Sequence, residues 1–190
     1  MRGKLLGVMD AQDHFAALGI ARAPWVDAEE LKSRFHALSS EQHPDAGGSA
    51  EAFAKLNTAW QALREPAGCL RHFLELQHPE ALVAASTTQA PAELADLFME
   101  IANLRQTAQK FSGKLAAAAS PITKALLEPQ RMALRTWLDA VAKGLGSRNT
   151  RITAALRDSA TTPDQLASSH ASLVFLGKWT ALLAELRLIL

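Results

Sequence analysis

The sequence predicts an all-α protein with an N-terminal helical hairpin and a C-terminal bundle of three helices. Three observations support this prediction. Alanine and leucine recur at helical spacing, while β-branched residues are sparse and do not alternate with polar ones. A short loop rich in proline and glycine joins two amphipathic stretches near residue 45. A stretch with prolines, serine and threonines at 77–91 then separates this hairpin from a longer helical region.

The first helix of the hairpin is predicted to begin after Asp27, whose carboxylate can cap the free amides of the next turn. Glu30, three residues later, completes a pattern like that of a capping box. Leu31, Phe35 and Leu38 follow at i, i+4 and i+7, the spacing of one helix face. These residues predict an amphipathic helix over 28–42.

The loop after this helix contains His43, Pro44 and Asp45. Pro44 has no amide hydrogen and disfavours a helical backbone at His43, so the helix must end near residue 42. Gly47 and Gly48 free the backbone, and Ser49 can cap a second helix. The apolar stripe of that helix consists of Ala52, Phe53, Leu56, Ala59, Trp60 and Leu63.

Two helices joined by a short loop must pack antiparallel if their apolar stripes are to be buried away from water. His43, Pro44 and Asp45 are therefore expected at an exposed tip, where a carboxylate held by a proline suits recognition of a cationic group on a partner. The alternative is a plain helix-terminating turn in which Asp45 is only a cap.

Three further helices are predicted: 92–115, a middle helix from Ile122 or Pro129 to about Arg157, and one from Pro163 to the C-terminus. Gly144 and Gly146 interrupt the middle helix. They either split it or remain within one helix at a cost of about 1 kcal/mol each. The sequence leaves both alternatives open.

The helix from residue 92 carries a candidate protein-binding surface. Its core stripe consists of Leu94, Leu97, Ile101, Leu104, Ala108 and Phe111. Met99 lies about 200° from Leu97 around the helix, Asn103 and Gln106 share its face, and Phe98 lies beside the stripe. An exposed methionine next to an aromatic ring is typical of an adaptable binding patch. Alternatively, Phe98 and Phe175 belong to the core.

Composition excludes several classes of protein. A hydrophobic fraction of 48% and a charged fraction of 21% are those of a globular chain. The net charge of +1 argues against an electrostatic nucleic-acid binder. No window has the length and apolarity of a membrane span. The single cysteine fits a reducing compartment, so we predict a cytoplasmic protein.

No chemistry of catalysis or metal binding is predicted. Cys69 and His72 have the spacing of half a zinc site, but no second cysteine exists to complete four ligands. We therefore expect Cys69 to be a small buried apolar residue, and we expect no metal and no cofactor. Neither a phosphate-binding glycine loop nor a nucleophile elbow is present. The chain is predicted not to be an enzyme.

The motifs together resemble a known family. The segments 13–19, 28–42, 43–45 and 56–63 resemble a J domain, specifically that of the HscB-type co-chaperones of iron–sulfur cluster assembly. Leu74-Glu75-Leu76 resembles the end of that J domain. The segments 96–100, 104–105 and 173–179 resemble helices of the family's C-terminal bundle. The resemblance implies a J domain at 10–76, a linker at 77–91 and a client-binding helical bundle at 92–190.

The resemblance also implies a function. A protein of this family stimulates ATP hydrolysis by a DnaK/HscA-type chaperone. The carboxylate of Asp45 would engage an arginine of the chaperone, with His43 and Pro44 holding the loop. Lys32, Arg34 and His36, on the preceding helix, would supply complementary charge.

The resemblance further implies that the bundle delivers a client, an iron–sulfur scaffold protein. The matching positions are Phe98, Met99, Ala102, Asn103, Gln106 and Phe175. Relatives have acidic residues where Asn103 and Gln106 stand, so the contact would be less charged here. Two alternatives remain: a J protein that serves another client, and a structural helical protein with a degenerate J-like hairpin.

Overall fold

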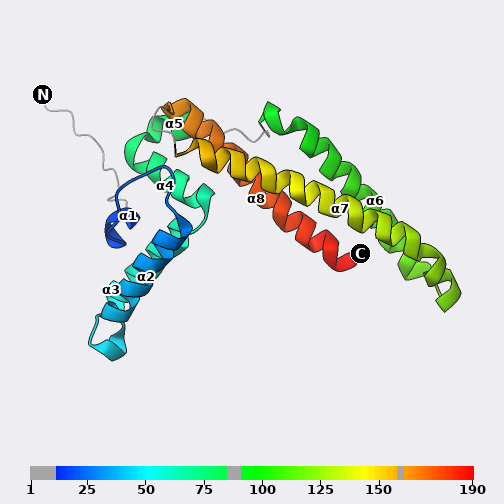
Figure 1. Ribbon diagram of the computed structural model, residues 1–190, viewed down its shortest axis with the longest axis horizontal. Helices are drawn as coiled ribbons and strands as arrows, with labels where there is room; N and C mark the ends of the chain where they lie inside the picture. Colours follow the sequence, from blue (N-terminus) through cyan, green and yellow to red (C-terminus); the bar gives the residue numbers. More distant parts are fainter. Residues whose placement is uncertain (1–11, 85–90, 158–160) are drawn as a thin grey trace, which may run out of the picture. The chain divides into compact units, whose positions relative to one another are not determined.

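The computed structural model of the protein describes residues 12–84, 91–157 and 161–190. Within these ranges every regular element is a helix, so the predicted all-α fold class is confirmed. Contacts divide the described residues into two compact units. The first contains 12–84, 156–157 and 161–167, and the second contains 91–155 and 168–190. Figure 1 shows the helices of each unit.

The first unit contains the predicted hairpin. Its elements are α1 (His14–Ala17), α2 (Ala28–Gln42), the short 3-10 helix η1 (Pro44–Ala46), α3 (Ala50–Leu63), α4 (Pro66–Gln77) and α5 (Pro79–Ala84). The helices α2 and α3 run side by side and are joined at the tip by η1 (Figure 1). Its core consists of Phe15, Leu18, Leu31, Leu56, Ala59, Leu63 and Cys69.

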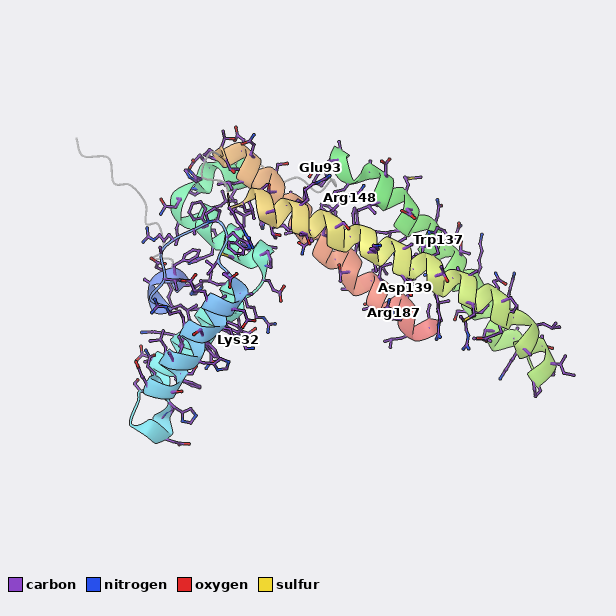
Figure 2. The ribbon with its side chains drawn as sticks, in the orientation of Figure 1. Lys32, Glu93, Trp137, Asp139, Arg148 and Arg187 are labelled. Carbon is purple, nitrogen blue, oxygen red and sulfur yellow. The ribbon has the colours of Figure 1, made fainter. Side chains whose placement is uncertain are left out.

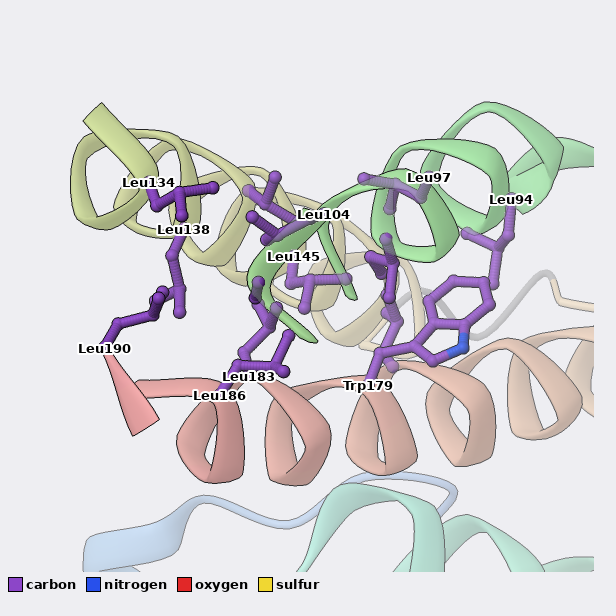
Figure 3. Packing of buried hydrophobic residues seen from close by; sticks show 14 of the residues in the cluster. Leu94, Leu97, Leu104, Leu134, Leu138, Leu145, Trp179, Leu183, Leu186 and Leu190 are labelled. Carbon is purple, nitrogen blue, oxygen red and sulfur yellow. The ribbon is translucent and has the colours of Figure 1, made fainter. Parts of the chain in front are cut away.

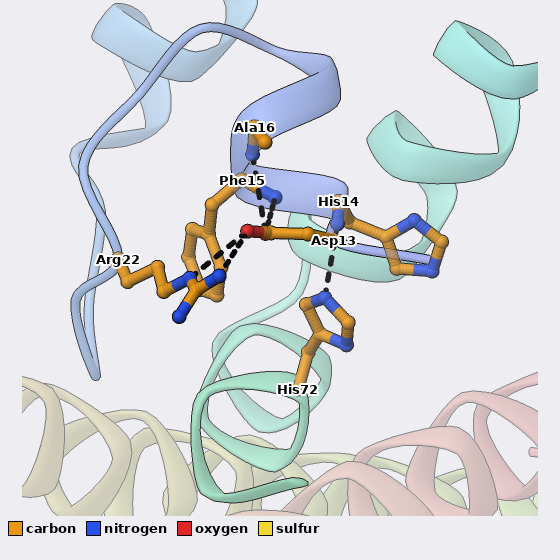
Figure 4. A network of polar contacts seen from close by, with 6 residues as sticks. All are labelled: Asp13, His14, Phe15, Ala16, Arg22 and His72. Atoms are coloured by element: carbon orange, nitrogen blue, oxygen red, sulfur yellow. Dashed lines mark hydrogen bonds and ion pairs between the residues drawn. The ribbon is translucent and has the colours of Figure 1, made fainter. Parts of the chain in front are cut away.

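Local capping fixes the ends of these helices. The Asp27 carboxylate accepts hydrogen bonds from the amides of Glu29 and Glu30, at 2.9 and 3.2 Å, as the sequence predicts. The hydroxyl of Ser49 accepts from the amide of Ala52 at the start of α3. Asp13 caps α1 in the same way (Figure 4). The hairpin is therefore specified largely by its own local sequence.

The second unit is a bundle of three long helices. They are α6 (Ala95–Ala117), preceded by η2 (Ala92–Leu94), α7 (Pro121–Ala155) and α8 (Pro163–Ile189), whose first residues, 163–167, belong to the first unit. The helix predicted to begin at Ala92 thus begins with one turn of 3-10 helix. The helix α7 is continuous through Gly144 and Gly146, which resolves the alternative that the sequence leaves open.

The core of the bundle is a leucine-rich cluster from all three helices (Figure 3). Every residue of the predicted α6 stripe is buried in it. Polar contacts join the helices at the rim. The Trp137 indole donates to Glu100 at 3.1 Å, and Arg187 pairs with Asp139 (Figure 2).

The predicted domain boundaries stay a prediction. Residues 10–11 of the predicted J domain and residues 85–90 of the predicted linker lie outside the described residues. Within the predicted linker, α5 forms one short helix, and its Ala81 is buried.

Candidate functional site

The tip of the α2–α3 hairpin is a turn in which His43, Pro44 and Asp45 each have a separate role. The backbone of His43 is extended, which ends α2 at residue 42 as the sequence predicts, and Pro44 begins η1. The His43 imidazole caps η1, because its Nδ1 accepts a hydrogen bond from the amide of Asp45 at 3.2 Å. In that state Nδ1 carries no proton, so the contact of 3.5 Å from Nδ1 to the Asp45 carboxylate is not an ion pair.

This arrangement holds the tip while leaving its charge free. The His43 ring packs edge-on against Phe53 of α3, with ring centroids 5.2 Å apart. The Asp45 side chain is 93% exposed. The tip therefore presents an exposed carboxylate on a turn that is fixed by packing, a proline and a side-chain cap.

Two glycines close the turn. Gly47 has a φ of 88°, a left-handed conformation that costs other residues free energy. Gly48 approaches the main chain of α2 so closely that a Cβ there would lie 2.1 Å from the carbonyl oxygen of Gln42. Its amide donates to the carbonyl of His43 at 3.0 Å. The turn thus requires glycine at both positions for a specific steric reason. The sequence indicates only that the two glycines make the backbone flexible.

The three predicted basic residues of α2 are all exposed, but they do not form one cluster. Lys32 (Figure 2) and His36 are four residues apart and share a side of the helix, whereas Arg34 lies about 200° around the helix from Lys32. The helix α2 contains two basic residues, Lys32 and Arg34, and three acidic ones, Glu29, Glu30 and Glu41. With histidine counted as neutral, its net charge is therefore −1. The candidate chaperone-facing helix is therefore only weakly basic on one side.

The second candidate site is the predicted patch on α6 and α8. Phe98 is 50% exposed and Met99 is 58% exposed. Ala102, Asn103 and Gln106 are also exposed, and they lie on the same side of α6. Phe175 is half-buried and packs against the bundle core. The structure thus brings the predicted residues of α6 onto one accessible surface.

A groove runs between α6 and α8 next to this patch. Its volume is about 300 Å³, and it is lined by Phe98, Ile101, Ala102, Arg105, Gln106, Gln109, Trp179 and Leu182. The Trp179 ring contacts both phenylalanines, with centroid distances of 6.3 Å to Phe98 and 5.8 Å to Phe175. The three rings of the two helices therefore form one aromatic cluster, in which Trp179 is nearly buried and Phe98 is half-exposed.

Five lining residues are not among the predicted site residues: Ile101, which is predicted as core, and Arg105, Gln109, Trp179 and Leu182. Arg105 and Gln109 lie seven and eleven residues after Phe98, a spacing that keeps them on its face, so this pattern could have identified them. Trp179 and Leu182 follow the predicted Phe175 at i+4 and i+7, which places them on one apolar stripe of α8. That this stripe borders the groove depends on how α8 packs against α6, which the sequence does not indicate.

Two histidines that are distant in the sequence contact each other in the first unit. His14 and His72, 58 residues apart, lie with ring centroids 4.4 Å from each other (Figure 4). Cys69 is buried in the core of the first unit, where burial raises the pKa of its thiol to about 12. Among the described residues, no group of three or more potential ligands could hold a metal ion.

The fold and the tip together define a class of protein: a helical hairpin with an exposed His-Pro-Asp turn, in a chain that also forms a three-helix bundle. Chaperone HscB from Vibrio cholerae has this fold, with a TM-score of 0.58 and 20% identity over 92% of this chain and 97% of that one. The predicted resemblance to HscB-type J-domain proteins is therefore confirmed at the level of the fold.

Sequence comparison adds evidence for the J domain. The chaperone protein DnaJ of Thermosynechococcus vestitus and that of Trichodesmium erythraeum are each 37% identical over 59 residues. The co-chaperone DNJ1 of Mycosarcoma maydis, a tetratricopeptide repeat and J domain-containing protein, is 33% identical over 60 residues. The match spans 30% of this chain and 15% of each DnaJ protein. No family model matches the chain.

No helix in the described part of the chain combines the length and the apolar character needed to cross a membrane. The prediction of a cytoplasmic location stays a prediction.

Proposed function

We propose that this protein is a J-protein co-chaperone that stimulates ATP hydrolysis by a DnaK/HscA-type chaperone and delivers an iron–sulfur scaffold protein to it. The observation that supports stimulation of the chaperone is the Asp45 carboxylate, which is exposed on a fixed turn at the tip of the hairpin. A preorganised carboxylate suits a charge-assisted hydrogen bond to an arginine of the partner. The groups that hydrolyse ATP belong to the chaperone, so the chain itself acts without catalysis.

Each residue of the tip has a separate role in this proposal. Asp45 engages the chaperone, His43 orients the Asp45 amide, and Pro44 ends α2 so that the turn projects from the hairpin. Lys32, with His36 beside it, supplies positive charge on one side of α2, and Arg34 supplies it on the other. Because the basic residues lie on two sides of α2, the proposed contact depends more on the tip than on electrostatic attraction along the helix.

The test is steady-state ATP hydrolysis by each DnaK-type chaperone of the host, with the parent protein and with Asp45→Asn. The substitution keeps the size and polarity of the side chain and removes its charge. We expect stimulation by the parent and none by the variant. A matched control is Glu41→Gln, which removes an exposed carboxylate of α2 outside the turn and should keep stimulation. Equal stimulation by Asp45→Asn and the parent would contradict the proposal.

The client half of the proposal rests on the patch of Phe98, Met99, Ala102, Asn103, Gln106 and Phe175. Two methionines of nearly equal exposure allow a controlled test: Met99 in the patch, 58% exposed, and Met132 on α7, 54% exposed. We expect Met99→Glu to weaken binding of the scaffold protein, measured by calorimetry, and Met132→Glu to leave it unchanged. Retained ATPase stimulation without scaffold binding would point to a J protein with another client.

The structural alternative is supported by the net charge of −1 on α2, since a partner with an acidic surface would be attracted weakly. In that case neither the parent nor Asp45→Asn would stimulate any of the chaperones.

A further inference from the structure

The groove between α6 and α8 has an unusual charge distribution. Arg105 is the single charged side chain among its lining residues. In the described part of the chain, no carboxylate lies within ion-pair distance of its guanidinium. The groove therefore combines an aromatic and aliphatic surface with one unpaired cation.

The three carboxylates of η2 and the first turns of α6 are not among the residues that line this groove. Glu93 accepts a hydrogen bond from the buried hydroxyl of Ser172 at 2.6 Å. Glu100 accepts one from the Trp137 indole of α7. Asp96 lies two residues before Phe98, and so about 160° from it around the helix. None of the three carboxylates lies on the face of Phe98.

Cations extend along the same face. Lys110 follows Met99 and Gln106 at i+11 and i+4, which continues their row toward the end of α6. On α8, the Lys178 ammonium lies 5.4 Å from the centroid of the Phe175 ring. Glu185, seven residues after Lys178, is the carboxylate on this side of α8. Arg105, Lys110 and Lys178 thus outnumber Glu185 around the groove.

From this charge distribution we infer that the groove binds an acidic amphipathic segment of the client. Apolar side chains of that segment cover Phe98 and Leu182, and a carboxylate pairs with Arg105. An arginine beside an apolar surface favours a carboxylate in two ways, because its planar fork can donate two parallel hydrogen bonds and water is partly excluded. The inference rests on the proposed function and names the chemistry of the partner at the same surface.

The probes are two fluorescein-labelled helical peptides with the same leucine and methionine face. One has glutamates at its polar positions and the other has lysines. Fluorescence anisotropy with the full-length protein at low salt should show the acidic peptide binding about tenfold tighter than the basic one. The preference should shrink at high salt, because exposed charges are screened.

The variant Arg105→Glu should remove or reverse the preference for the acidic peptide. Arg135→Glu, an equal charge change at an exposed position of α7, should keep it. Circular dichroism of both variants establishes that they fold. Equal or tighter binding of the basic peptide, failure of both peptides to bind, or an unchanged preference in Arg105→Glu would each overturn the inference.

Failure of this inference is distinguishable from failure of the proposed function. Stimulation of the chaperone ATPase that depends on Asp45 requires neither peptide. A protein that stimulates hydrolysis but shows no charge preference retains the co-chaperone function and loses this inference. A protein that prefers the acidic peptide but never stimulates hydrolysis retains the charge preference and loses the co-chaperone function.

Discussion

The Nε2 atom of His72 accepts a hydrogen bond from the main-chain amide of His14 at 3.0 Å. The bond joins the first turn of α1 to α4, and it exists only while Nε2 carries no proton. The Nδ1 atom of His14 is buried without a hydrogen-bond partner. The pair is therefore a contact within the first unit, and a proton added to the His14 ring would disturb it.

Acid should destabilise the first unit through His14. Burial, together with the nearby His72, holds the pKa of His14 below its usual value of 6.5, although Asp13 and Glu75 act in the opposite direction. Below pH 6.5 the unfolded chain then binds more protons at this residue than the folded protein. The contribution of His14 to stability is therefore complete above that pH and is lost as the pH falls.

The measurement is the midpoint of thermal unfolding from about pH 7.5 to about pH 5.5. We expect His14→Gln to reduce the loss of stability on the acid side. His78→Gln, which changes a histidine outside the pair, should keep that loss. An identical pH profile for His14→Gln and the parent would show that His14 has no part in it.

The thiol of Cys69 should react slowly in the folded protein. Burial raises its pKa from 9.0 to about 12, so the thiolate fraction at a given pH is on the order of a thousandfold lower than in the unfolded chain. Reaction with a chromogenic disulfide should be slow in buffer and fast in denaturant. Fast reaction in buffer would place the thiol in solvent and contradict the buried position.

Alanine at Gly48 should weaken the hairpin tip. The added Cβ would overlap the carbonyl oxygen of Gln42, which is main chain and cannot rotate away. We expect Gly48→Ala to lower the free energy of unfolding by about 2 kcal/mol. Gly113→Ala is the control, since a Cβ there meets nothing within 4 Å inside α6. It should raise stability by about 0.5 to 1 kcal/mol. Chemical denaturation followed by circular dichroism compares the two, and equal effects would contradict the close approach.

Lysine at Ser40 should strengthen chaperone binding. Ser40 is exposed and continues the row of Lys32 and His36 toward the tip, at successive spacings of four residues. We expect Ser40→Lys to tighten binding about two- to fivefold at low salt.

The control for this charge change is Thr58→Lys on α3. Both hydroxyls donate to the carbonyl four residues earlier, at 3.0 Å for Ser40 and 2.9 Å for Thr58, so the two substitutions remove equivalent bonds. Calorimetry with the chaperone should show the gain for Ser40→Lys alone. The absence of any gain would favour the structural alternative for this protein.

Local interactions explain why the hairpin could be predicted from sequence. Asp27, Pro44 and Ser49 act on amides or carbonyls within four residues of themselves, so their effects are readable without tertiary structure. The core stripe of α6 could be predicted for the same reason, because its residues recur at the helical period and all of them are buried.

Features that depend on packing could not be predicted. Each glycine inside α7, Gly144 and Gly146, destabilises the helix by about 1 kcal/mol relative to alanine. The helix is continuous because burial of its apolar side chains outweighs this cost. The buried neighbours Val141 and Leu145 supply such burial, each worth about 1.5 to 3 kcal/mol. The pairing of His14 with His72, and of Phe98 with Trp179, depends on how separate helices meet. No periodicity within one helix contains that information.

The position of Trp179 gives the protein an optical reporter of its own. The chain has four tryptophans and no tyrosine, so light beyond the absorption of phenylalanine excites indole groups alone. Trp179 lines the groove, contacts Phe98 and Phe175, and is nearly buried. A partner that covers the groove changes the surroundings of this indole. Occupancy of the bundle can therefore be followed by intrinsic fluorescence without a label, with Trp179→Phe to identify the responding residue.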